Sequence, residues 1–114
     1  MQKARRHNFA EVYAGDIAIS ICPSNIENAQ LTAAQAADDL LNIIGIKASF
    51  VLSQVDDTIY CSGRSLGNIN VQLILEKLGG GGHRTVSGGQ FKNITIEEAV
   101  KNLKLAIDEY LQEE

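Results

Sequence analysis

The sequence predicts an α/β (α+β) domain in which a mixed β-sheet is flanked by helices. Two observations support this: several segments alternate in hydrophobicity as strands do, and helical patterns are interleaved between them, so hairpin and crossover connections are both required. A chain of 114 residues with 45% hydrophobic residues has room for one core. Three of its ten basic residues crowd into the first six positions, ahead of any apolar periodicity. We therefore expect residues 1–8 to be a linker or tag and residues 9–114 to form the domain.

The first half of the domain is predicted to hold two short extended segments, a helix and a hairpin. Residues 9–21 contain the extended segments, the second alternating in hydrophobicity. Residues 29–42 are rich in Ala, Leu and Gln and predict a helix, with Gly45 after it in a position that favours a left-handed cap. Residues 46–55 and 58–63 alternate around a polar pair of aspartates and predict an antiparallel hairpin.

The second half is predicted to hold two helices with a glycine run between them. Residues 70–78 carry apolar side chains at helical spacing, and four consecutive glycines stop that pattern. Thr95 and Glu98 have the spacing of a capping box. An apolar stripe with helical period then runs from Ile96 to Leu111, which predicts a final helix.

Composition limits the classes of function. The formal charge of −4 argues against a broad basic surface for nucleic acid, so any anion site must be local. No apolar run approaches a membrane span and no signal-peptide core begins the chain, so the domain is expected to be soluble. Cys22 and Cys61 lie in apolar, strand-like runs and are expected to act as small hydrophobes. With only two histidines and no CxxC spacing, no zinc site is predicted.

The run Gly79-Gly80-Gly81-Gly82 is the feature that most needs a functional explanation. Four glycines have a large backbone entropy cost, and no turn type requires all four. Bare backbone allows close ligand approach, and successive amides can form a concave anion nest. His83 at the exit can donate to the same anion, and Arg84 adds a charge beside it. The alternative is a flexible surface loop with an ordinary histidine. The Walker pattern and GxGxxG are both absent.

Arg64 is a second candidate for anion binding. It stands at the predicted end of a strand, where its guanidinium could form the bidentate fork that suits a phosphate or a carboxylate. On position alone, an arginine at the solvent-exposed edge of the sheet is the simpler interpretation. The four acidic pairs of the chain are interpreted as helix caps and solvated faces, because adjacent side chains on a helix diverge. These pairs are Asp38-Asp39, Asp56-Asp57, Glu97-Glu98 and Glu113-Glu114.

The region from Cys61 to Gly89 resembles the DHHA1 domain of the DHH/DHHA1 phosphoesterase family. The motifs that carry the resemblance are Arg64-Ser65, Asn70-Val71, Gly79-Gly80-Gly81-Gly82-His83-Arg84 and Gly88. Three further segments resemble most the membrane-anchored cyclic-di-AMP phosphodiesterases of Gram-positive bacteria, namely Asn25-Ile26-Glu27-Asn28, Ala36-Ala37-Asp38 and residues 65–71. The resemblance covers about residues 9–111 and implies a DHHA1-like fold.

The resemblance implies a division of labour between two domains. In that family the DHH domain holds two manganese ions and activates water, while DHHA1 closes over the cleft and fixes the phosphate and base of the nucleotide. By motif, Arg64 and the loop from Gly79 to His83 are expected to contact the substrate, with Arg84 a weaker candidate. The implied partners are a nucleotide or cyclic dinucleotide and the DHH domain of the same polypeptide, with a homodimer left open. A cytoplasmic domain without membrane contact, in a membrane-anchored parent, is also implied.

The departures from the family pattern define what this chain lacks. No Asp-His-His triplet occurs, so neither catalytic residues nor a cofactor or metal are expected in this chain, and it is expected to be inactive alone. Family members often carry small apolar residues before the glycine at position 88, whereas residues 85–89 of this chain read Thr-Val-Ser-Gly-Gly. Two alternatives remain: a stand-alone regulatory module that binds a nucleotide, and the DHHA1 domain of an oligoribonuclease-type phosphoesterase.

Overall fold

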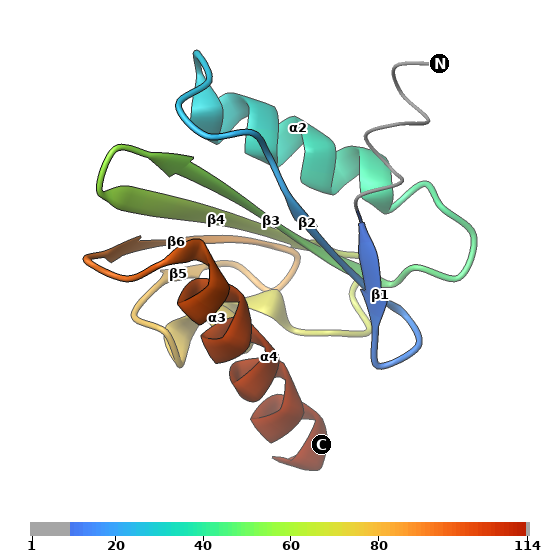
Figure 1. Ribbon diagram of the computed structural model, residues 1–114. Helices are drawn as coiled ribbons and strands as arrows, with labels where there is room; N and C mark the ends of the chain where they lie inside the picture. The colour runs from blue at the N-terminus through green and yellow to red at the C-terminus, as the bar shows by residue number, and fades with distance from the viewer. Residues whose placement is uncertain (1–9, 114) are drawn as a thin grey trace.

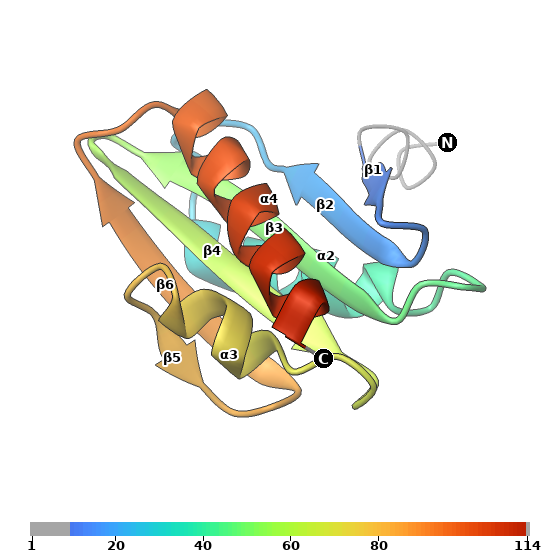
Figure 2. The ribbon, with the colours of Figure 1, turned by 90° about the horizontal axis from the view of Figure 1, so that it is seen from below.

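One mixed sheet of six strands organises the molecule, in the order β1-β2-β3-β4-β6-β5. The computed structural model describes residues 10–113, so the predicted linker or tag at residues 1–8 lies outside the described residues. The helices α3 and α4 lie on one face of the sheet and α2 on the other (Figures 1 and 2), which confirms the predicted class. The elements are β1 (Glu11–Tyr13), β2 (Ile17–Ile21), α2 (Ala29–Leu40), β3 (Ala48–Val55), β4 (Thr58–Ser65), α3 (Val71–Glu76), β5 (Gly81–Gly82), β6 (Val86–Lys92) and α4 (Ile96–Glu113).

The connections explain why the sheet is mixed. β2 and β3 are parallel, and α2 makes the crossover that a parallel pair requires. The other neighbouring pairs of the sheet are antiparallel. The predicted hairpin is confirmed as β3 and β4, paired in continuous register from Ala48 opposite Ser65 to Val55 opposite Thr58. Asp56, with φ 54, forms the tight turn between them.

Two apolar layers hold the helices against the sheet. The layer under α2 is small and consists of Ala18, Ala33, Ala37, Leu40, Ile46 and Val51. The opposite layer, under α3 and α4, is larger because it combines buried side chains from three strands, β2, β3 and β4, with those of both helices. Its largest fully buried members include Phe50, Ile17, Leu52, Ile59, Ile74, Leu75, Leu103 and Ile107.

The predicted starts of α3 and α4 are confirmed by hydrogen bonds at their N-terminal caps. The Asn70 side chain accepts from the Leu73 amide at 3.2 Å and begins α3. At α4, the Thr95 amide donates to the Glu98 carboxylate at 3.0 Å and the Glu98 amide donates to the Thr95 hydroxyl at 3.0 Å. This reciprocal pair is the predicted capping box. No described helix has the length and apolar character needed to cross a membrane.

The structure differs from the sequence prediction at two places. α2 ends at Leu40, and turns occupy most of residues 41–45, so Gly45 with φ 90 closes a turn beyond the helix instead of capping it. In addition, β5 forms within the glycine run and β6 follows it, and neither strand was predicted. Glycines at both β5 positions, and Gly88 with Gly89 in β6, removed the β-branched signal that identifies a strand.

Candidate functional site

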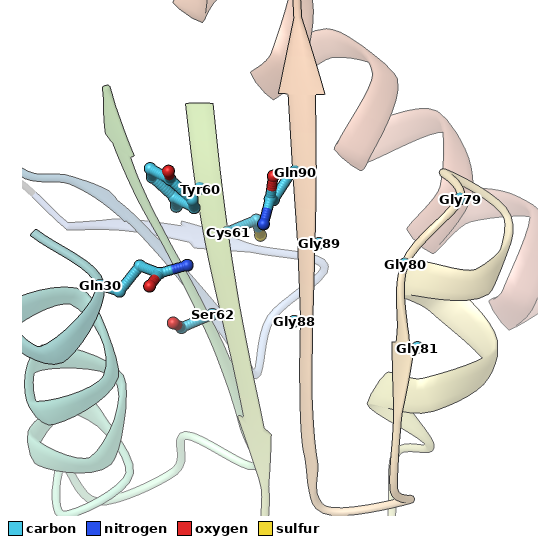
Figure 3. Close-up of a pocket in the computed structure, with 10 residues that line it drawn as sticks. All are labelled: Gln30, Tyr60, Cys61, Ser62, Gly79, Gly80, Gly81, Gly88, Gly89 and Gln90. Carbon is cyan, nitrogen blue, oxygen red and sulfur yellow. The ribbon is translucent and has the colours of Figure 1, made fainter. Parts of the chain in front are cut away.

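A cleft of about 470 Å³ lies on the α2 side of the sheet, where β5 and β6 extend beyond the helix. α2 contributes one side chain to its wall, and Figure 3 shows that side chain, Gln30, extending towards β4. The opposite wall is glycine backbone, visible in Figure 3 as ribbon without side chains. The lining residues are Gln30, Tyr60, Cys61, Ser62, Gly79, Gly80, Gly81, Gly88, Gly89 and Gln90.

Alternation along β4 supplies the floor of the cleft. Ile59, Cys61 and Gly63 are buried, and the intervening Tyr60 and Ser62 are only partly buried, as expected of successive residues on opposite faces. Desolvation by burial raises the pKa of the Cys61 thiol to about 12. The thiol therefore belongs to the core and offers no nucleophile to the cleft.

Arg64 continues the cleft face of β4 and is held by α2. Its Nε donates to Asp38 Oδ1 at 3.1 Å, and its Nη1 donates to the Gly63 carbonyl at 2.9 Å. The arginine side chain is 15% exposed and the aspartate side chain 64% exposed. Asp38 is largely exposed, as predicted for a solvated acid, and its ion pair with Arg64 is an additional contact that was not predicted. The pair was invisible in the sequence because 26 residues separate the partners.

The register of the sheet brings the predicted residues Arg64 and His83 into one row. Arg64 is opposite Val86 in the β4–β6 pair. Val86 in turn exchanges both backbone hydrogen bonds with His83, at 2.7 and 3.3 Å. Neighbouring strands are about 5 Å apart, so the backbones of Arg64 and His83 are separated by roughly 10 Å. His83 is exposed. The row lies next to the cleft, because Ser62, two residues before Arg64 on the same face of β4, lines the cleft.

Gly79 and Gly80 have structural tasks at the end of α3. The Gly80 amide donates to the Leu75 carbonyl at 2.8 Å and the Gly79 amide donates to the Glu76 carbonyl at 3.1 Å. With φ 88 at Gly79, this is a Schellman cap. A Cβ on Gly80 would come within 2.4 Å of the Gly88 carbonyl oxygen. The predicted anion nest is therefore wrong for these two amides, because the helix end already uses them.

Gly81 and Gly82 differ sharply although both form β5. Gly82 has φ 144, and a Cβ there would meet the Val86 carbonyl oxygen at 2.6 Å. A Cβ on Gly81 would meet nothing within 4 Å, and its φ is not positive. Gly81 pairs with Gly88, which pairs with Ser62, so the three residues share the cleft face. Gly81 is therefore the glycine of the run that neither a positive φ nor steric crowding requires.

Arg84 makes hydrogen bonds that stabilise the segment following β4. Its Nε donates to the Gly67 carbonyl at 2.9 Å, and its own carbonyl accepts from the Val71 amide at 3.0 Å. The neighbouring Thr85 carbonyl accepts from the Ser65 amide at 3.0 Å. These bonds fix the turn that carries His83 against the strand that carries Arg64.

Four cleft side chains were missed by the sequence analysis, namely Gln30, Tyr60, Ser62 and Gln90. None belongs to a motif, and they come from three separate elements. The alternation of β4 alone could have flagged Tyr60 and Ser62 as the polar face of a strand. Among residues 10–113, no group of three or more His, Cys, Asp or Glu side chains is arranged to hold a metal ion. The residues described do not fit the manganese centre of the family's catalytic domain.

Comparison with known proteins decides the family. The model of the DHHA1 domain matches residues 15–113. The chain belongs to the DHHA1 domain family. It is 46% identical over 110 residues to the cyclic-di-AMP phosphodiesterase PdeA of Listeria monocytogenes, covering 96% of this chain. It is 42% identical over 115 residues to the cyclic-di-AMP phosphodiesterase GdpP of Bacillus subtilis, covering 98% of this chain. It spans only 17% and 18% of these two relatives.

Solved structures show the same fold. An exopolyphosphatase-related protein from Bacteroides fragilis matches 94% of this chain and 33% of its own, with a TM-score of 0.78 and 25% identity. The C-Ala domain of alanyl-tRNA synthetase from Aquifex aeolicus matches 85% of this chain and 96% of its own, with a TM-score of 0.64 and 22% identity. The second likeness concerns the fold alone. The cleft and the neighbouring row of Arg64 and His83 therefore lie on a DHHA1 fold.

Proposed function

We propose that this DHHA1 domain recognises the nucleotide substrate of a phosphodiesterase that hydrolyses cyclic dinucleotides, specifically cyclic-di-AMP. Catalysis is assigned to a separate DHH domain with bound manganese. The observation that carries the proposal is the row formed by Arg64, Val86 and His83, which lies next to a cleft of about 470 Å³ on the same face of the sheet. Ser62 and Gly88, the neighbouring pair of the register on that face, line the cleft, whereas the three residues of the row do not. A row with an arginine and a histidine beside an uncharged cleft matches a phosphate joined to a nucleoside. The names of the two bacterial relatives support the cyclic dinucleotide as substrate.

The phosphate contact is assigned to Arg64 and His83. The bonds of the guanidinium to Asp38 and Gly63 use Nε and Nη1, and a guanidinium has five N–H donors in a rigid fork, so donors remain for a phosphate. Gly81 supplies an open wall through which the ligand approaches. The shape of the loop is assigned to the backbone geometry and hydrogen bonds of Gly79, Gly80, Gly82 and Arg84.

The test is a calorimetric titration of the chain with cyclic-di-AMP, the linear dinucleotide and AMP, repeated with Arg64→Ala and His83→Ala. Charge-assisted hydrogen bonds are worth roughly 1.5–3 kcal/mol, so each variant should lose at least about tenfold in affinity. Lys101→Ala is the matched control, since Lys101 is an exposed cation of α4 on the far face. Lys104 would be a poor control because it pairs with Glu11 at 2.8 Å.

The result of this titration also separates the alternatives. Preference for cyclic-di-AMP supports the proposal, whereas a clear preference for the linear dinucleotide would favour an oligoribonuclease-type parent. Unchanged affinity in both variants, with intact thermal unfolding, would rule out the phosphate site. We also expect the chain alone to hydrolyse no phosphodiester in excess manganese. Turnover that persists after control for contaminating nucleases would contradict the assignment of catalysis to another domain.

A further inference from the structure

The hydrogen bonds of Arg64 leave one edge of its guanidinium open. Its Nε donates to Asp38 Oδ1 at 3.1 Å, and its Nη1 donates to the Gly63 carbonyl at 2.9 Å. A guanidinium has five N–H donors, so these two bonds leave three, on Nη1 and Nη2. A phosphate can accept from two donors at once along either the Nε–Nη2 edge or the Nη1–Nη2 edge. Because Asp38 occupies Nε, the Nη1–Nη2 edge is the one available for bidentate binding.

A buried hydrogen bond anchors the part of α2 that carries Asp38. Ser49 is the cross-strand partner of Arg64 in the β3–β4 pair. The Ser49 hydroxyl donates to the carbonyl of Ala37 at 2.6 Å, and both residues are 0% exposed. Ala37 directly precedes Asp38. The backbone next to the carboxylate is therefore bonded to the residue opposite the arginine, which fixes the carboxylate relative to the guanidinium.

Stability does not explain the ion pair between Asp38 and Arg64. The aspartate side chain is 64% exposed and the arginine side chain 15% exposed. An ion pair with a solvent-exposed partner contributes little to the free energy of unfolding, because water screens the attraction. A carboxylate beside a phosphate site also disfavours an anionic ligand. Its presence there therefore points to a role in binding.

An acid that contacts a phosphate-binding arginine can have either of two roles. It can compete with the ligand by occupying the guanidinium, or it can hold the guanidinium in the orientation that the ligand needs. A competitor is expected to span the fork with both oxygens, as a phosphate does. Asp38 contacts Nε through Oδ1 and leaves the Nη1–Nη2 edge open. The geometry therefore favours the second role.

We propose that Asp38 is a positioning residue of the phosphate site, which holds Nε of Arg64 and presents the Nη1–Nη2 edge to the phosphate. This inference rests on the proposed function, because the phosphate contact of Arg64 is part of it. An arginine that is immobilised before the ligand arrives loses less conformational entropy on binding. Loss of the Asp38 carboxylate should therefore weaken the binding of an anion, whereas simple charge repulsion predicts the opposite sign.

The experiment measures the affinity for AMP by calorimetry in the wild-type chain and in three variants of α2. Asp38→Ala should bind AMP about three- to tenfold more weakly, because the arginine is no longer immobilised. Asp38→Asn should stay within about twofold of wild type, because a carboxamide oxygen can still accept from Nε. Asp39→Ala is the matched control: Asp39 is the adjacent exposed acid, and its removal leaves the bond between Asp38 and Arg64 in place. Its affinity should be unchanged or slightly higher.

Two further measurements separate positioning from a general effect on α2. In the isotopically labelled chain, the Nε–H proton of Arg64 should exchange with water more slowly in wild type and Asp38→Asn than in Asp38→Ala. In an Arg64→Ala background, Asp38→Ala should have no further effect on the affinity for AMP. A loosened helix would instead lower the affinity in both backgrounds.

The outcomes distinguish this inference from the proposed function. If Arg64→Ala weakens AMP binding and Asp38→Ala leaves it unchanged, the positioning role is wrong and the phosphate site stands. Tighter binding by Asp38→Ala would show that the carboxylate competes with the ligand. Equal losses in Asp38→Ala and Asp39→Ala would indicate an effect on charge or on the helix, and would also overturn the role. Unchanged affinity in Arg64→Ala, or no binding by the folded wild-type chain, would remove both proposals together.

Discussion

The two faces of the sheet contrast in what covers them. On the face of α3 and α4, large apolar side chains such as Phe50 and Leu103 are fully buried. On the α2 face the apolar layer is small, and the part formed by β4, β6 and β5 keeps glycines and polar side chains around a cleft. A single strand, β4, serves both faces by alternation. The contrast between the two faces separates residues that stabilise the fold from residues available to a ligand.

Truncation of the covered face should have the largest effect. Phe50 is 0% exposed and packs in the larger core, so Phe50→Ala should lower the free energy of unfolding by about 3–5 kcal/mol. Ser62→Ala, on the cleft side of β4, should change it by no more than about 0.5 kcal/mol. Urea denaturation followed by circular dichroism measures both. Comparable losses of unfolding free energy in the two variants would contradict the distinction between a face that stabilises the fold and a face available to a ligand.

The two glycines of β5 provide a finer test, because Gly81 lines the cleft and Gly82 does not. Gly82→Ala should destabilise the fold by about 1–3 kcal/mol, because its φ of 144 is strained for alanine and its Cβ meets backbone. Gly81→Ala should keep stability, or raise it by about 0.4–1 kcal/mol, and should still weaken AMP binding. Thermal unfolding and titration of both variants check this. Unaltered AMP binding by Gly81→Ala would argue that this glycine is not part of a ligand wall.

The sequence predicted most of the elements, and physical reasons explain those it missed. The capping box at Thr95 and the alternation of β4 are local signals, which a single sequence carries. β5 and β6 were missed because their glycines carry no strand signal, and the Arg64 partner was missed because it is distant in sequence. Arg64 and His83 were singled out by motif, but only the sheet register brings them into one row. Among the cleft side chains, Tyr60 and Ser62 follow the local alternation of β4. Gln30 and Gln90 could not be predicted, because only the packing of α2 on the sheet and the pairing of β6 with β4 bring them to the cleft.

The buried thiol on the covered face should make stability depend on alkaline pH. Burial raises the folded pKa of Cys61 from 9.0 to about 12, so the folded state retains a proton that the unfolded state loses. The stabilisation is therefore complete below pH 9 and is lost as the pH rises from 9 towards 12, at about 1.4 kcal/mol per unit. Denaturation at pH 8 to 10.5 should show this slope relative to Cys61→Ala, with Cys22→Ala as control. Identical slopes in wild type and Cys61→Ala would contradict it.

Two buried serines of β3 give the smallest expected effects, with opposite signs. The Ser49 hydroxyl donates to the Ala37 carbonyl at 2.6 Å, so Ser49→Ala should lose about 1 kcal/mol of stability. The Ser53 hydroxyl is buried and has no hydrogen-bond partner within residues 10–113. Ser53→Ala should therefore be neutral or gain up to about 1 kcal/mol. Equal destabilisation by both variants, measured in urea, would show that Ser53 has a polar partner.

The most direct test of the cleft as a nucleotide site is an NMR titration of the isotopically labelled chain with AMP. We expect amide shifts at Gly81, at residues 60–64 of β4 and at residues 86–90 of β6, around the cleft and the Arg64 and His83 row. The exposed residues of α4, on the opposite face, should not shift. Shifts confined to α4, or no shifts at millimolar AMP in a demonstrably folded chain, would contradict the central claim that the α2 face carries the nucleotide site.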